Sequence, residues 1–260
     1  MMAQAQTANP VVVQDLALGD LVKALAAGWS DFRQHPIFGL FFAAIYVAAG
    51  MGLYFGVTTL GEPAWLFPIV AGFPIVAPFI AVGLYEVSRR REVGLPMQWK
   101  PILGALNGRG DEQIILMGGF VFVAFSFWII IAHTISLVFL PNAGMGGDIF
   151  ETLLSTSGLM MLGVGGVTGG LLAWGLFSIT IISLPMLVDR DVDCITAIIA
   201  SVKTVRSNML VMLVWAAIVV VTLLIAMVPF LLGLFVALPV LGHATWHLYR
   251  RAITVPAAVA

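Results

Sequence analysis

The sequence predicts an all-α polytopic membrane protein with six transmembrane helices, arranged as three hairpins that are each preceded by a cytoplasmic amphipathic helix. Three observations support this class. Hydrophobic side chains make up 61% of the 260 residues and charged ones only 10%, whereas soluble domains are close to half apolar and a quarter charged. Apolar runs long enough to cross a bilayer recur along the chain. All 12 Lys and Arg residues fall in alternate connections between these runs.

A helix needs about 20 mainly apolar residues to cross a hydrocarbon core about 30 Å thick. Six segments meet this requirement, at about 37–60, 64–86, 114–140, 158–188, 209–228 and 230–249. The last two form one apolar run, and Pro229 at its midpoint predicts a tight turn between two helices. We expect residues 1–14 to be a retained flexible tail, because they lack the basic segment of a signal peptide. Residues 15–260 are expected to form a single transmembrane domain.

The positive residues predict the orientation of the chain. They lie before the first span, between the second and third, between the fourth and fifth, and after the sixth. Short loops rich in Lys and Arg stay in the cytoplasm, so both termini are expected there, in a bacterial cytoplasmic (inner) membrane. Aromatic and basic residues on this side are the expected membrane-interface anchors: Trp29, Arg89, Arg90, Arg91, Trp246, Arg250 and Arg251.

Amphipathic segments precede the predicted hairpins. In residues 15–32 the apolar side chains recur at helical spacing, and residues 195–206 repeat the design with a stripe of Ile and Val. Residues 97–113 form a weaker middle copy, interrupted by proline and glycine. This pattern predicts three parallel repeats of a surface helix plus a hairpin. The alternative is that any interfacial helix leading into a hairpin has such a pattern.

Four motifs resemble a family of bacterial integral membrane proteins of unknown function. They are GWSDFRQHPIFGLFF (28–42), PFIAVGLYEVSRR (78–90), PMLVDRDVDCITAIIASVKTVR (185–206) and PVLGHATWHLYRR (239–251). Some members of this family are loosely labelled as oxidase-related, but it has no established chemistry. The resemblance therefore implies a six-span membrane fold and no mechanism.

Small residues predict where helices pack closely. In the fourth span Gly165 pairs with Gly169 and Gly166 with Gly170 at four-residue spacing, and Gly52 and Gly56 repeat this spacing in the first span. Such pairs let two helix backbones approach each other. The contact is expected inside the bundle, with the first span as one possible partner for the fourth, or else with another protein. The second span contains Pro68, Pro74 and Pro78, which predict a kink and a possible groove for a lipid or another hydrophobic ligand.

Histidines are the only candidate ligands for a cofactor. His243 and His247 lie one helical turn apart on one face of the sixth span. They are weak candidates for haem or metal binding, since a full site needs further ligands; the alternative is that His243 hydrogen-bonds between helices and His247 anchors the interface. No cofactor is therefore predicted, and no metal site. Serine-hydrolase, zinc-protease and phosphate-loop motifs do not occur, so no catalytic residue is assigned.

These features favour a non-enzymatic accessory or assembly subunit beside a larger bacterial inner-membrane complex, with a respiratory complex as one candidate. The expected partners are the lipid bilayer and other membrane-protein subunits, and not nucleic acid. A carrier or binder of a small neutral or lipidic molecule is the alternative, and a haem- or metal-binding membrane protein is a third. Charges are nearly absent from the spans, which argues against ion-coupled transport.

Overall fold

The computed structural model describes residues 11–12, 15–59, 77–107, 112–139 and 149–254. The predicted all-α class is confirmed, with one small pair of strands added. In chain order the elements are β1 (Val11–Val12), α1 (Leu18–Gln34), α2 (Pro36–Thr59), α4 (Ala77–Glu92), α5 (Trp99–Leu103), the 3-10 helix η3 (Gly104–Asn107), α6 (Gln113–Phe139), α7 (Ile149–Leu154), α8 (Thr156–Asp189), α9 (Cys194–Ser207), α10 (Met209–Met227), α11 (Leu234–Ala252) and β2 (Ile253–Thr254).

Four of the described helices are long and apolar enough to cross a membrane, namely α2, α6, α8 and α10. They correspond to the first, third, fourth and fifth predicted spans. Most of the second predicted span, residues 64–76, lies outside the described residues, and its remainder forms the start of α4. The sixth predicted span is the helix α11, whose two histidines and two arginines make it the more polar partner of α10. The protein is thus a multi-pass helical membrane protein, and the six-span arrangement remains a prediction.

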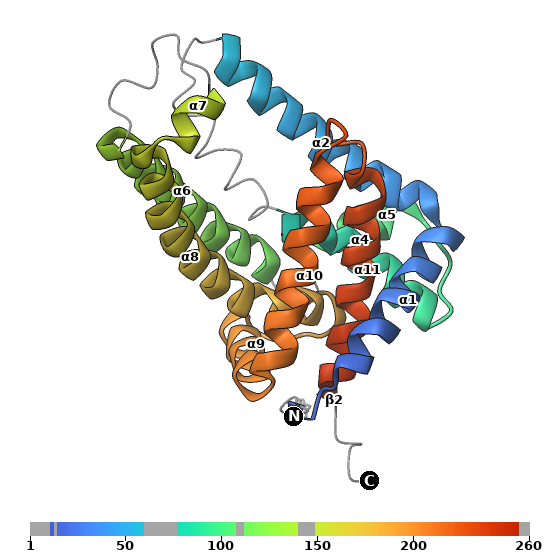
Figure 1. The fold of residues 1–260 in the computed structure, drawn as a ribbon. Coiled ribbons are helices and arrows are strands. Elements are labelled where there is room, and N and C mark those ends of the chain that lie inside the picture. Colours follow the sequence, from blue (N-terminus) through green and yellow to red (C-terminus); the bar gives the residue numbers. More distant parts are fainter. Residues whose placement is uncertain (1–10, 13–14, 60–76, 108–111, 140–148, 255–260) are drawn as a thin grey trace.

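Helix α11 lies at the centre of one half of the molecule (Figure 1). It packs against α1, α2, α4, α8 and α10. The closest approach is to α1, where a Cβ atom on Gly28 would lie 2.6 Å from the backbone nitrogen of Ala244. Glycine at this position lets the two helices touch backbone to backbone. Because other helices surround α11, its side chains Trp246, Leu248 and Tyr249 are fully buried.

Helices α6 and α8 run side by side and form the other half (Figure 1). Ser155 caps the start of α8 by accepting a hydrogen bond from the backbone N–H of Gly158 at 3.1 Å. The last third of α8 is buried from Thr180 to Val188, where it meets α4, α9 and α11. The first half of α8 packs mainly on α6 and α7, so the two halves of the molecule join near one end.

Both ends of the described chain lie together. Val11 pairs with Thr254 and Val12 with Ile253 in an antiparallel ladder between β1 and β2. A part of the predicted loose tail is therefore paired with β2, which directly follows α11. Arg89, Arg90, Arg91, Arg250 and Arg251 lie toward the same end of the bundle, which we call the basic end.

Candidate functional site

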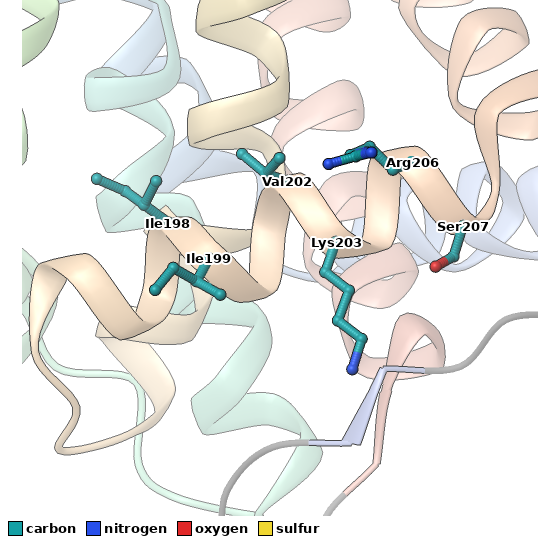
Figure 2. Close-up of a pocket in the computed structure, with 6 residues that line it drawn as sticks. All are labelled: Ile198, Ile199, Val202, Lys203, Arg206 and Ser207. Atoms are coloured by element: carbon teal, nitrogen blue, oxygen red, sulfur yellow. The ribbon is translucent and has the colours of Figure 1, made fainter.

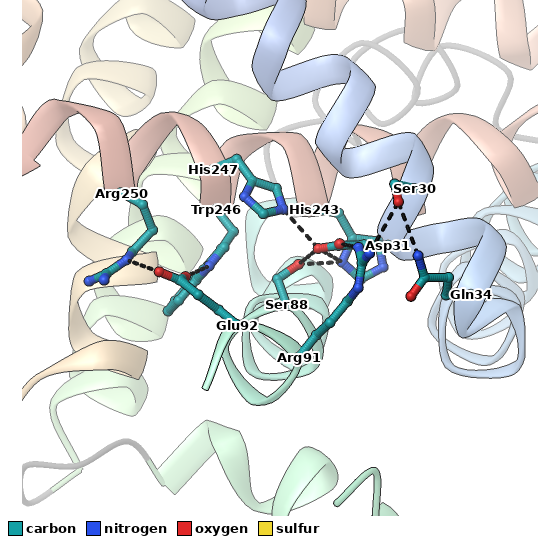
Figure 3. Close-up of polar contacts among 10 residues, drawn as sticks. All are labelled: Ser30, Asp31, Gln34, Ser88, Arg91, Glu92, His243, Trp246, His247 and Arg250. Carbon is teal, nitrogen blue, oxygen red and sulfur yellow. Dashed lines mark hydrogen bonds and ion pairs between the residues drawn. The ribbon is translucent and has the colours of Figure 1, made fainter. Parts of the chain in front are cut away.

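A buried polar cluster joins three helices near the basic end (Figure 3). Its members are Asp31 of α1, Ser88 and Arg91 of α4, and His243 and His247 of α11. Asp31, Ser88 and His243 are each at most 1% exposed. We call these five residues the Asp31 cluster.

Asp31 reaches the interior because of the face that α1 turns to α11. Leu21, Ala24, Gly28 and Asp31 recur at spacings of three and four and are all buried, as one face of a helix requires. The small residues Ala24 and Gly28 bring the helices together. The carboxylate of Asp31 then enters the gap between α4 and α11.

The carboxylate of Asp31 accepts hydrogen bonds from three side chains. Ser88 Oγ donates to Asp31 Oδ2 at 2.6 Å, and His247 Nε2 lies 2.9 Å from the same oxygen. Arg91 forms an ion pair with the other oxygen, Oδ1, and also donates to Ser30. A buried charge is tolerated when it is paired and hydrogen-bonded, and Asp31 meets both conditions.

Proton positions follow from the chemistry of the carboxylate. An ionised carboxylate can only accept hydrogen bonds, so the Ser88 proton points to Asp31 and His247 carries its proton on Nε2. Ser88 Oγ lies 2.7 Å from His243 Nδ1 and accepts from it, which leaves the lone pair of a neutral His243 on Nε2. That atom is buried and has no hydrogen-bond partner among the described residues.

This arrangement differs from a serine-hydrolase triad, in which the histidine sits between the acid and the serine. Here Ser88 sits between Asp31 and His243, so its proton is turned away from the imidazole. Ser88 is also buried and out of reach of a substrate. The geometry instead links α1, α4 and α11 through one continuous chain of hydrogen bonds.

Two further carboxylates extend this link across the basic end. Glu92 of α4 accepts from Trp246 Nε1 at 3.0 Å and from Arg250 Nε at 3.0 Å, both on α11. Asp189 at the end of α8 accepts from Tyr249 Oη at 2.8 Å and from Arg250. Four helices are thereby connected by polar contacts that extend from the buried Asp31 cluster to the exposed Arg250. Figure 3 shows the Glu92 contacts beside the Asp31 cluster.

The two candidate haem or metal ligands are engaged within the protein. His247 Nε2 bonds Asp31 and His243 Nδ1 bonds Ser88. Among the described residues, no group of three or more His, Cys, Asp or Glu side chains is arranged to hold a metal ion. His243 does hydrogen-bond between helices, which was the alternative explanation for this residue.

A small hollow opens beside the cluster. It measures about 210 Å³ and is lined by Asp20, Lys23, Ala24, Ala27, His247 and Arg251. The backbone N–H of Ala17 donates to Asp20 and lowers the pKa of that carboxyl. Two members of the cluster are partly exposed, Arg91 at 29% and His247 at 26%, and of these His247 lines the hollow.

The six glycines predicted to pack against other helices differ in how close their nearest neighbours are. A Cβ atom on Gly169 would lie 2.5 Å from the Trp128 ring of α6, so Gly169 sits in a close helix contact. A Cβ atom on any of the other five would meet nothing within 4 Å among the described residues: Gly52, Gly56, Gly165, Gly166 and Gly170. Packing of these five stays a prediction.

The predicted membrane-interface anchors differ in exposure and in their contacts. Trp29 is 45% exposed on α1. Trp246, in contrast, is fully buried and donates to Glu92, so it lies inside the bundle and not at its surface. The five arginines form ion pairs with carboxylates of the chain: Arg89 and Arg90 with Glu86, Arg91 with Asp31, Arg250 with Glu92 and Asp189, and Arg251 with Asp15 and Asp20.

The four motifs quoted from the sequence meet at the basic end. Residues 28–42 supply Asp31, residues 78–90 supply Ser88, residues 185–206 supply Asp189, and residues 239–251 supply His243 and His247. A comparison with known protein families finds a match for the middle of the chain. Residues 66–189 match the family described as "Predicted integral membrane protein (DUF2189)". This segment, a little under half of the chain, is thus similar to DUF2189. The resemblance to an integral membrane family of unknown function is thus confirmed, and no curated protein and no solved structure matches the chain.

The matched segment, residues 66–189, contributes Ser88, Arg91, Glu92 and Asp189, while the flanking helices α1 and α11 contribute the other members of the polar network. Sequence reasoning missed Asp31 and Ser88. A signal for Asp31 exists, since it continues the spacing of Leu21, Ala24 and Gly28 on one helical face. No comparable pattern marks Ser88, whose role depends on the partners that the fold brings to it.

Proposed function

We propose that this membrane protein is a non-enzymatic accessory or assembly subunit that docks a transmembrane helix of a larger bacterial inner-membrane complex against α8. The observation that carries the proposal is a row of small residues on α8 that faces away from α6. The row consists of Gly163, Gly166, Gly170 and Ala173, at spacings of three, four and three.

The two sides of α8 are distinct. On the side toward α6, Gly169 meets Trp128 and Met161 is buried. On the other side, a Cβ atom on Gly163, Gly166 or Gly170 would contact nothing within 4 Å in the described part of the chain. The small-residue row therefore offers a flat surface to a second helix.

Lipid alone does not account for such a row. Lipid tails are as apolar as leucine, and helix association in membranes depends on close backbone approach at small residues. Other exposed helices of this protein present bulky apolar side chains to their surroundings, as α10 does with Leu213, Val220 and Leu224. The row on α8 lacks that bulk, which supports a helix of another subunit as its partner.

Leucine substitutions on the row test this proposal. Gly166→Leu combined with Gly170→Leu fills the surface, and the chain is then purified from native membranes in mild detergent with quantitative mass spectrometry of co-purifying proteins. We expect the wild-type chain to retain a membrane protein at stoichiometric level and the double variant to lose it.

A matched control is available within the chain. Gly119→Leu combined with Gly175→Leu makes the same chemical change at two helix positions that are also open, and this control should keep the partner. A wild-type chain that purifies alone, or only with further copies of itself, would contradict the proposal. Retention of the partner by Gly166→Leu/Gly170→Leu would contradict it as well.

A further inference from the structure

Helix α9 turns mainly small residues inward and exposes two isoleucines on its opposite face. The buried face consists of Cys194, Ala197, Ala200, Ser201, Thr204 and Val205. Ile195 and Ile199 are 66% and 62% exposed on the opposite face. Of the apolar stripe identified in the sequence, Ile195 and Ile199 therefore point away from the bundle, while Ile198 and Val202 are half-buried and Val205 is buried.

Polar contacts fix this orientation. Ser201 Oγ donates to the backbone carbonyl of Ser178 at 2.7 Å and accepts from the backbone N–H of Ile182 at 3.2 Å, both on α8. A rotation of α9 that buried Ile195 and Ile199 would break these bonds inside the bundle. The exposed isoleucines are thus a stable feature of the fold.

Two positively charged side chains lie next to these apolar side chains. A hollow of about 670 Å³ runs along α9 and is lined by Ile198, Ile199, Val202, Lys203, Arg206 and Ser207 (Figure 2). Lys203 and Arg206 form no ion pair with the carboxylates that the structure describes, in contrast to Arg250 and Arg251. Their charges are therefore available to an external anion.

We infer that this face of α9 binds an anionic phospholipid such as phosphatidylglycerol. Lys203 and Arg206 contact the phosphate, and Ile198, Ile199 and Val202 contact the first carbons of the acyl chains. Surface helices that combine apolar and basic residues on one face bind anionic lipid in this way. The inference rests on α9 alone and is independent of the helix-docking surface of α8.

A lipid titration of the purified full-length chain tests the inference. The wild-type protein in detergent is titrated with phosphatidylglycerol, with phosphatidylcholine and with inorganic phosphate, and bound lipid is counted by native mass spectrometry. We expect Lys203→Gln combined with Arg206→Gln to weaken phosphatidylglycerol binding about 30-fold, since each basic residue near an anionic membrane contributes about fivefold. Phosphatidylcholine binding should not change.

The control removes the same charge elsewhere. Arg33→Gln combined with Lys100→Gln replaces two basic residues that also form no ion pair with a described carboxylate and line neither hollow. This control should bind phosphatidylglycerol as the wild type does. Equal losses in both double variants would overturn the inference, because they would indicate a general charge effect. Competition by inorganic phosphate at millimolar concentration would overturn it in favour of a free-anion site.

Discussion

Asp31 is the residue on which the basic end depends most. Its carboxylate is 1% exposed and is held by Ser88, Arg91 and His247 from two other helices. Ser88 is fully buried beside this negative charge, and Arg91 and His247 are largely buried. Removal of the carboxylate would leave the Arg91 guanidinium partly buried without its counter-charge, and Ser88 and His247 without their acceptor. An uncompensated buried charge is strongly destabilising.

Substitution at position 31 should therefore destabilise the protein markedly. We expect Asp31→Ala to lower the free energy of unfolding by about 4 kcal/mol, and Asp31→Asn to lower it by less because the amide oxygen still accepts hydrogen bonds. The measurement is thermal unfolding of the purified chain in detergent, followed by circular dichroism. Gln34→Ala, at an exposed position of the same helix, is the control and should change stability by at most about 0.5 kcal/mol. Similar stability for Asp31→Ala and wild type would show that the cluster is not a structural clamp.

At the level of the elements, the start of α9 is fixed by its N-cap residue. Asp193 caps the helix, because its carboxylate accepts from the backbone N–H of Thr196 at 2.8 Å and from the Thr196 hydroxyl at 2.6 Å. These bonds lower the pKa of Asp193 below its usual value of 3.8. The cap positions the start of α9 and thus the face that carries Ile195, Ile199 and Lys203.

Loss of this cap should cost about 1 kcal/mol. Because the folded-state pKa of Asp193 is lowered, its stabilising effect is complete above pH 3.8 and is lost as the pH falls below that value. We expect Asp193→Ala to be less stable than wild type in unfolding experiments at pH 7, with a smaller difference at pH 3. Asp191→Ala changes an exposed aspartate two residues earlier and serves as the control. Equal effects of the two substitutions at pH 7 would argue against a capping role.

For the whole molecule, the pairing of β1 with β2 constrains the topology. The two ends of the chain can pair only if they lie on the same side of the membrane, which requires an even number of crossings. Four described helices qualify as spans, and the two remaining predicted spans would bring the number to six. The basic residues near this paired end support a cytoplasmic location for both termini.

Reporter fusions check this topology. Alkaline phosphatase, which is active only outside the cytoplasm, should be active when inserted between residues 141 and 148 and inactive after residue 260. Green fluorescent protein after residue 260 should fluoresce, because the arginines at 250 and 251 favour a cytoplasmic location for that end. An active phosphatase at the C-terminus would contradict the predicted orientation.

Length and composition were sufficient to predict most of the spans. The apolar runs that became α2, α6, α8 and α10 are uninterrupted by charge, and a membrane accepts few other structures for such segments. The family resemblance was likewise visible in the motifs. For α11 the same reasoning gave the helix but not its buried central place, because a polar face can be covered by neighbouring helices as readily as by water or headgroups.

The sequence by itself determined the fold class, four of the spans and the turn near Pro229, since backbone hydrogen bonding and hydrophobic length act locally along the chain. The tertiary structure alone decided which faces are covered. It brought Asp31 to Ser88, 57 residues away, and to His247, 216 residues away, and it turned Ile199 of α9 outward and Trp246 of α11 inward. Helical periodicity specifies which residues share a face, but the element that packs against that face depends on contacts between distant parts of the chain.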